Sequence, residues 1–182
     1  MIPFDDPFHG NVKYKVTCPR YNQSTESPVQ DEVFGSAYAS AVYLSTVVKF
    51  PPNKKVYVIG MAGLETELAS EGISYVGGTT PEDNTLEPFS LSDFRNDPDI
   101  GAVLCGLDMH INYTKLSKAF QYLRLNEGCL FLATNTDSTY PVNGGLLPGA
   151  GSLSATLRYA LKRDPVSIGK PGPTMLDCIK AK

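Results

Sequence analysis

Short apolar runs alternate with amphipathic stretches along most of the chain. Runs typical of buried strands lie at 55–59, 73–76, 100–107, 129–133 and 166–168. Between them, apolar positions at helical spacing predict helices at 36–48, 64–70, 113–125 and 153–162. Short apolar strands that alternate with helices are typical of a largely parallel sheet, so the pattern predicts an α/β fold.

Three segments are predicted to lack regular structure. The first 30 residues hold few periodic apolar positions, so they offer little apolar surface to offset the loss of chain entropy on folding. Residues 79–98 are polar and predict a loop with a helical turn near Ser92. The strand at 129–133 is expected to open into a long loop that continues to the next helix, with glycine and proline turns on the way.

Composition and charge narrow the possible partners. The 182 residues carry 16 Lys and Arg against 19 Asp and Glu, a formal charge of −3. The basic residues are scattered, whereas a nucleic-acid surface concentrates them, so no nucleic-acid partner is expected. No apolar run approaches the ~20 residues that span a bilayer, and the N-terminus does not resemble a signal peptide, so no membrane partner is expected. The four cysteines form no C-x-x-C pair, which favours a reduced, cytoplasmic protein.

The turn after the strand at 55–59 carries two glycines, Gly60 and Gly63. A dinucleotide-binding fingerprint needs three glycines, for the turn, the pyrophosphate approach and the helix packing. The pair therefore favours a tight strand-to-helix turn over a nucleotide site.

A second candidate is the polar loop that follows the strand at 129–133, where ligand sites of α/β proteins form. Thr134, Asn135 and Asp137 could contact a substrate, or could hold the loop's own backbone. The glycine-rich start of the next helix could hold an anion, although capping by Ser152 is the commoner arrangement.

Lys170 lies at the end of an apolar strand, between Gly169 and Pro171, which fixes its position. Taken alone, such a lysine is more often a surface residue. His9 and His110 are far apart and indicate no metal site. No G-x-S-x-G nucleophile elbow is present, so a catalytic triad is not indicated.

Several motifs together resemble the 4-nitrophenylphosphatase, phosphoglycolate phosphatase and pyridoxal phosphatase branch of the haloacid dehalogenase superfamily. They occur in the same order from about Asp31 to the C-terminus: Val33–Ala41, Lys55–Gly60 with Gly63–Leu64, Gly106–Tyr113 with Lys115–Leu116, Gln121–Leu123, Ala133–Asn135 with Asp137, Pro148–Ser152 and Gly169–Pro171. So many ordered matches make coincidence implausible.

The resemblance implies a fold, a reaction and a set of binding residues. The fold would be a C2-type α/β cap domain with part of a Rossmann-like core. Members of the family hydrolyse small phosphate esters through an aspartyl-phosphate, with Mg²⁺ as cofactor and a cap that selects the substrate. Lys170 would bind the phosphate, and Asn135, Asp137, Thr139 and Tyr140 would form the cap's substrate loop. The cap also suggests a possible homodimer.

The departures from the family pattern concern the catalytic acids. The Asp-x-Asp nucleophile motif and the later Gly-Asp-x-x-x-Thr-Asp metal motif are absent, and Asp97-Pro98-Asp99 follows no strand. No catalytic residue and no bound metal are therefore expected in this chain, because Mg²⁺ needs converging carboxylates. Three hypotheses remain open: an incomplete piece of a phosphatase, a non-catalytic binding or dimerising module derived from the cap, or, least favoured by the pattern, an independent enzyme that uses other residues.

The resemblance also predicts how the chain divides. Residues 1–30 would be weakly structured, 31–50 a helix derived from the core, 51–165 the cap, and 166–182 a remnant of the core. The strand at 166–168 would then lack neighbours and leave an unpaired edge.

Overall fold

The computed structural model describes residues 35–169 and 173–181. Its elements, in chain order, are α1 (Ser36–Val42), the π-helix η2 (Tyr43–Val47), β1 (Lys55–Ile59), α2 (Ala62–Ser70), β2 (Tyr75–Gly77), β3 (Ile100–Cys105), α3 (Tyr113–Leu125), β4 (Leu130–Ala133), β5 (Thr139–Val142), β6 (Gly145–Pro148), α4 (Ala150–Leu161), β7 (Val166–Ser167) and α5 (Thr174–Ala181). The predicted α/β fold with a parallel sheet is confirmed. The expected weak structure of residues 1–30 lies outside the described residues.

Five strands form one parallel sheet in the order β2-β1-β3-β4-β7. Leu104 of β3 lies opposite Val58 on one side and Leu132 on the other, at the centre of the sheet. The expectation that the strand near residue 166 lacks neighbours was wrong, because Val166 pairs with Leu132 in β4. β4 pairs with one side of β7, which is the last strand in the sheet order, and the sequence pattern could not reveal this pairing.

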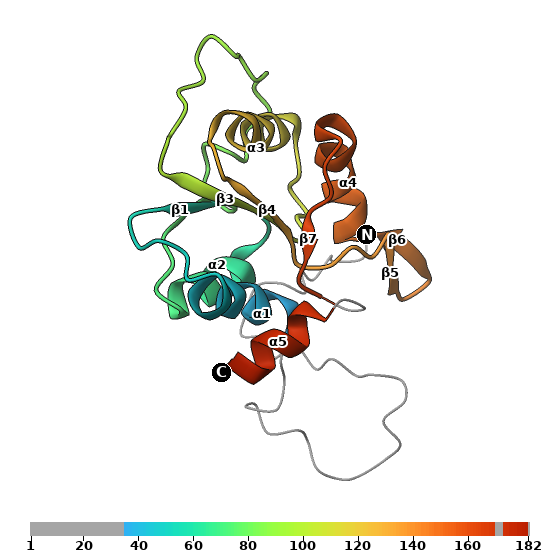
Figure 1. Cartoon of the computed structure of the whole chain (residues 1–182). Helices are drawn as coiled ribbons and strands as arrows, with labels where there is room; N and C mark the ends of the chain where they lie inside the picture. The colour runs from blue at the N-terminus through green and yellow to red at the C-terminus, as the bar shows by residue number, and fades with distance from the viewer. Residues whose placement is uncertain (1–34, 170–172, 182) are drawn as a thin grey trace. The chain divides into compact units, whose positions relative to one another are not determined.

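The sheet buries side chains on both of its faces. Alternate residues of β1 face opposite ways, so Tyr57 packs toward α3 and α4 while Val58 packs toward α1 and α2. Figure 1 shows the resulting layers, with α3 and α4 on one side of the sheet and α1, α2 and α5 on the other. Burial on both faces explains why the strand sequences are continuously apolar.

The segment predicted as one helix, 36–48, begins as α1 and continues as the π-helix η2. A single π-helical turn is wider than an α-helical turn, but it changes the spacing of apolar residues too little to be recognised from the sequence. Gly72 adopts φ of +71° just after α2, as expected of a left-handed residue at a helix end.

Three elements were not predicted, the two strands of a hairpin and the last helix. β5 and β6 form an antiparallel hairpin within the expected long loop, with Tyr140 opposite Leu147. Helix α5 follows the Gly-Lys-Pro segment and packs on α1 and η2, with Cys178 as its buried residue. Within the described part of the chain, no helix is long and apolar enough to cross a membrane.

Candidate functional site

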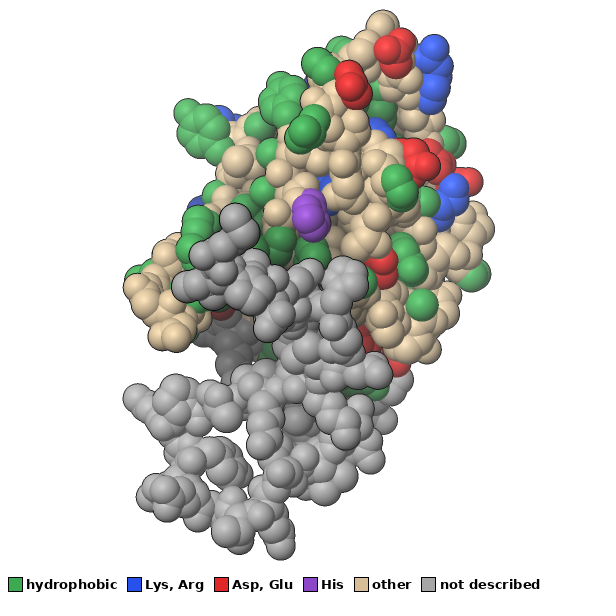
Figure 2. All heavy atoms as spheres, turned by 180° about the vertical axis from the view of Figure 1, so that it is seen from behind, with side chains coloured by type: hydrophobic (Ala, Val, Ile, Leu, Met, Phe, Trp, Pro, Cys, Tyr) green, Lys and Arg blue, Asp and Glu red, His purple; other side chains and the backbone are tan. Residues whose placement is uncertain are grey.

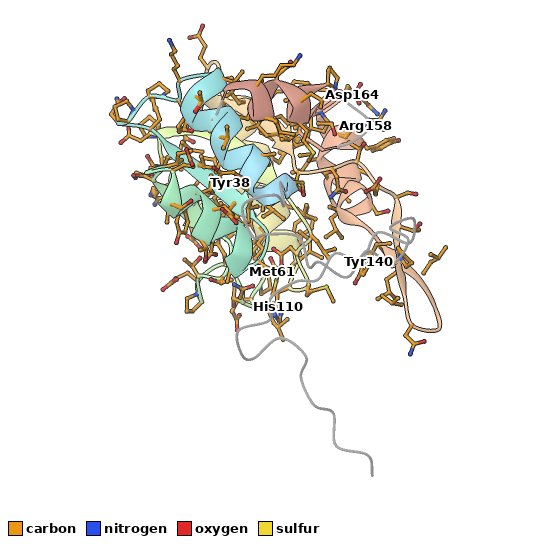
Figure 3. All side chains as sticks on the ribbon, turned by 90° about the horizontal axis from the view of Figure 1, so that it is seen from below. Tyr38, Met61, His110, Tyr140, Arg158 and Asp164 are labelled. Carbon is orange, nitrogen blue, oxygen red and sulfur yellow. The ribbon has the colours of Figure 1, made fainter. Side chains whose placement is uncertain are left out.

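The carboxyl ends of β1, β3, β4 and β7 lie along one edge of the sheet, because the four strands are parallel. Gly60, Gly106, Thr134 and Gly169 follow these ends. Figure 3 shows Met61 and His110 on this side, in the connections after β1 and β3, and Tyr140 on the hairpin. This edge is where the sequence places its candidate chemistry.

The loop after β4 carries the residues predicted to contact a substrate. Thr134 is buried, Asn135 and Tyr140 are partly buried, and Asp137 and Thr139 are exposed. The Asn135 side-chain oxygen accepts a hydrogen bond of 3.2 Å from the Asp137 N–H, which is an Asx-type turn. Part of the loop's polarity therefore holds its own backbone, while the Asp137 carboxylate is available to solvent.

The N-terminus of α4 does not have the arrangement expected from the sequence. Its N-cap is Gly149, and no side chain caps the helix. The expectation that Ser152 caps it was wrong, because the Ser152 hydroxyl donates instead to the Ser138 carbonyl oxygen, at 2.5 Å. The Gly149 and Gly151 N–H groups also donate to the loop, so these two donors are engaged by carbonyls rather than free for an anion.

The end of β7 lies directly against the same loop. The Ile168 N–H donates to the Ala133 carbonyl at 2.9 Å. A Cβ atom added to Gly169 would lie 2.5 Å from the Thr134 carbonyl oxygen and 3.0 Å from Asn135 Cβ. Lys170, the predicted phosphate-binding residue, is outside the described residues, but the residue before it contacts the loop.

A buried ion pair between the connection after β3 and helix α3 was not predicted. Asp108 Oδ2 lies 2.7 Å from Lys115 Nζ, and both side chains are at most 1% exposed. Asp108 Oδ1 also accepts a hydrogen bond from the His110 N–H, at 2.8 Å. The carboxylate therefore ties the β3–α3 connection to α3. The His110 side chain is exposed on the surface, as Figure 2 shows for the histidine it colours purple.

A second buried network links β1 to the segment between β2 and β3. The Tyr57 hydroxyl donates to Asp83 Oδ2 at 2.6 Å, and Lys118 forms an ion pair with Asp83 Oδ1. Burial, followed by the Asp83 charge, raises the pKa of Tyr57 far above its ordinary value. The Asn112 side chain caps α3 and also donates to the Asp83 carbonyl, which joins this network to the β3–α3 connection.

The described residues do not fit a magnesium site. In residues 35–169 and 173–181, no three side chains of His, Cys, Asp or Glu lie close enough together to hold a metal ion. Asp108 is engaged by Lys115. Asp97 precedes β3 at the opposite edge of the sheet and pairs with Lys55. No step through a metal can be assigned to these residues.

Curated proteins with related sequences are phosphatases. The chain is 45% identical over 152 residues to 4-nitrophenylphosphatase of Schizosaccharomyces pombe, an alignment that covers 83% of this chain and 51% of that protein. It is 41% identical over 157 residues to phosphoglycolate phosphatase 2 of Arabidopsis thaliana, covering 86% of this chain and 52% of the relative. The chain thus spans about half the length of the curated relatives it matches.

Solved structures with a similar fold are also phosphatases. Glycerol phosphate phosphatase of Mycobacterium tuberculosis, determined with magnesium, has a TM-score of 0.63 and 31% identity, over 82% of this chain and 40% of that one. A p-nitrophenyl phosphatase from Archaeoglobus fulgidus has a TM-score of 0.64 and 26% identity, over 86% and 53%. No family model matches the chain. By sequence and fold, the chain is similar to about half of a haloacid dehalogenase-type phosphatase, in the branch of 4-nitrophenylphosphatase and phosphoglycolate phosphatase.

Proposed function

We propose that this chain is the substrate-selecting part of a phosphatase for small phosphate esters. In this proposal residues 51–165 correspond to the cap. Asn135, Asp137, Thr139 and Tyr140 contact the organic part of the ester, and Lys170 binds its phosphate.

The observation that carries the proposal is the contact between the β4–β5 loop and the end of β7. A Cβ atom added to Gly169 would lie 2.5 Å from the Thr134 carbonyl oxygen and 3.0 Å from Asn135 Cβ, so the described end of the β7 segment lies against the loop. An ammonium and a polar loop at one sheet edge would hold the two ends of a phosphate ester, because a lysine is a compact cation suited to phosphate. The relatives are named as phosphatases of 4-nitrophenyl phosphate, phosphoglycolate and glycerol phosphate, which supports this class of ligand.

We further propose that this chain alone does not hydrolyse the ester. Transfer of a phosphoryl group to a carboxylate needs an aspartate nucleophile, and no Asp-x-Asp motif follows an apolar strand in the sequence, since Asp97-Pro98-Asp99 precedes one. The lack of fit to a metal in the described residues supports the same proposal.

Binding can be tested with the full chain and 2-phosphoglycolate by nuclear magnetic resonance. Addition of the ester should shift the amide signals of residues 134–140 and of Gly169, and leave those of β2 unchanged. The variant Lys170→Ala should lose most of this binding, because the phosphate loses its cation. Lys180→Ala, which removes an exposed lysine from α5, is the matched control and should bind as the parent does.

Turnover is tested with 4-nitrophenyl phosphate and Mg²⁺. We expect no release of 4-nitrophenol above the rate without protein. A rate that depends on Lys170 would overturn the proposal of an inactive chain. Ester binding that is unaffected by Lys170→Ala would overturn the proposed site.

A non-catalytic dimerising module is the second candidate. The observation that favours it is the β5–β6 hairpin, which exposes Leu146 by 65% and Leu147 by 41%. Exposed apolar side chains on a hairpin are a common feature of protein interfaces. Light scattering after size-exclusion chromatography distinguishes a monomer from a dimer. If the parent chain is a dimer, the variant Leu146→Lys should be a monomer. A parent chain that is monomeric at high concentration excludes this candidate.

A further inference from the structure

The backbone of residues 134–138 is packed against glycines. A Cβ atom on Gly169 would lie 2.5 Å from the Thr134 carbonyl oxygen, and one on Gly149 or Gly151 would overlap backbone atoms of the loop. None of these three glycines has a positive φ. An alanine could therefore adopt the same backbone conformation, and it is the closeness of the loop that excludes a side chain.

The N-terminus of α4 donates three hydrogen bonds to the loop. The Gly149 N–H donates to the Ser138 carbonyl at 2.8 Å, and the Gly151 N–H donates to the Asp137 carbonyl at 2.9 Å. The Ser152 hydroxyl donates to the Ser138 carbonyl at 2.5 Å. The first N–H groups of a helix have no partner within the helix, so the loop carbonyls satisfy donors that would otherwise need water.

We propose that Gly151 and Ser152 are positioning residues for the substrate loop. This inference rests on the proposed function, because it assigns the loop the role of contacting the ester. The main chain of Asp137 and Ser138 is held by α4, while both of their side chains are exposed. The helix therefore determines where the loop presents its polar groups, and Gly151 and Ser152 act without touching the ester.

The Ser152 hydroxyl is tested by amide hydrogen exchange on the full chain. The Ser152 hydroxyl and the Gly149 N–H share the Ser138 carbonyl oxygen as acceptor. Ser152→Ala removes one hydrogen bond that holds this carbonyl, and loss of a typical neutral hydrogen bond should speed exchange of the Gly149 amide about fivefold. Exchange of Val58 in β1 should not change, because that strand is remote from the loop in the sheet. Ser152→Thr keeps a hydroxyl at the same position and should restore slow exchange.

Gly151 is tested by adding the side chain that the loop excludes. Gly151→Ala should shift the amide signals of residues 134–138 and weaken 2-phosphoglycolate binding about tenfold or more, because the loop must move away from α4. Gly63→Ala is the matched control: this glycine also lies in the first turn of a helix, and its added Cβ would have no atom within 4 Å. The control should leave the loop signals and the affinity unchanged.

The outcomes separate this inference from the proposed function. If the parent chain binds no 2-phosphoglycolate, the proposed function fails, and the exchange and shift data still decide whether α4 positions the loop. Unchanged exchange in Ser152→Ala together with unchanged loop signals in Gly151→Ala would overturn the inference. Faster exchange at Val58 in Ser152→Ala would also count against it, because the effect would then be a general loss of stability.

Discussion

Asp108 and Lys115 form an ion pair of 2.7 Å whose side chains are almost completely buried, between the end of β3 and the first turns of α3. Removing two charges from water costs about as much free energy as their attraction returns, so such a pair contributes little net stability. Loss of one partner is nevertheless costly, because the other charge then stays buried without compensation. The pair also orders the backbone of the connection, since Asp108 accepts the His110 N–H.

Removing one partner of this pair should be strongly destabilising. Lys115→Met leaves a buried carboxylate without its cation and should lower the free energy of unfolding by about 3–5 kcal/mol. Urea unfolding followed by circular dichroism measures the change. Asp108→Leu combined with Lys115→Met should be less destabilising than the sum of the single changes. Arg158→Met is the control, because its ion pair with Asp164 is exposed and should be worth less than about 1 kcal/mol. Equal losses at the two sites would contradict this account.

The hydroxyl of Tyr57 should stabilise the fold through Asp83. Tyr57→Phe removes the 2.6 Å hydrogen bond to a buried carboxylate and should cost about 1–3 kcal/mol, because a bond to a charged group is lost. Tyr113→Phe is the matched control, since Tyr113 is 76% exposed and should be neutral. Thermal unfolding of the two variants decides the point, and a neutral Tyr57→Phe would show that Lys118 alone satisfies Asp83.

Two buried thiols should be unreactive in the folded protein. Burial, and then the nearby Asp108 charge, raises the pKa of Cys105 to about 12. Burial raises the pKa of Cys129 to about 11, against the opposing charges of Arg163 and Lys54. At pH 8 only about one Cys105 in ten thousand would be a thiolate, the reactive form. Iodoacetamide at pH 8 should label both residues in urea and neither without it, as read by peptide mass spectrometry. Rapid labelling of Cys105 in the folded chain would contradict its burial.

The partly exposed pair of Lys55 and Asp97 should make a small contribution to stability that depends on pH. The hydrogen bond from Lys55 lowers the pKa of Asp97 below its ordinary value, and the same bond raises the pKa of Lys55. The lowered pKa of Asp97 means that its contribution is fully present above about pH 4 and is lost as the pH falls through the folded-state pKa. The raised pKa of Lys55 means that its contribution is lost at the alkaline end, as the pH rises through the folded-state value.

The difference in urea midpoint between the parent and Asp97→Asn measures the acidic limb of this dependence. The parent should be more stable at pH 7, and the difference should shrink toward pH 2. A difference that stays constant over this range would mean that the Asp97 charge is not involved.

The central strands were predictable from the sequence because they are buried on both faces and therefore continuously apolar. The β5–β6 hairpin was not, because every residue in it except Tyr140 is exposed, and no buried face imposes an alternating pattern. The pairing of β7 with β4 is a tertiary contact between segments separated by a hairpin and a helix, which local periodicity does not encode.

The candidate loop was found because it follows a parallel strand, but the residues that hold it were not. Ser152 near a helix start suggests a cap, and only the packing of the loop on α4 shows that its hydroxyl donates elsewhere. Lys115 belongs to a recognisable motif, yet a lysine on a helix is ordinarily a surface residue. The close spacing of Gly149 and Gly151 at the start of a helix was the available signal for a backbone that approaches closely.

β7 joins the sheet through only two residue pairs, Leu132 with Val166 and Ala133 with Ser167. The hairpin and α4 lie between the two strands in the chain, so pairing β7 with β4 closes a long connection. Closing it costs chain entropy, and the two residue pairs offset little of that cost. We therefore expect β7 to dock late in folding, after β1, β3 and β4 have assembled, and to detach first on unfolding. The backbone that leads to Lys170 would then acquire its place in the last step of assembly.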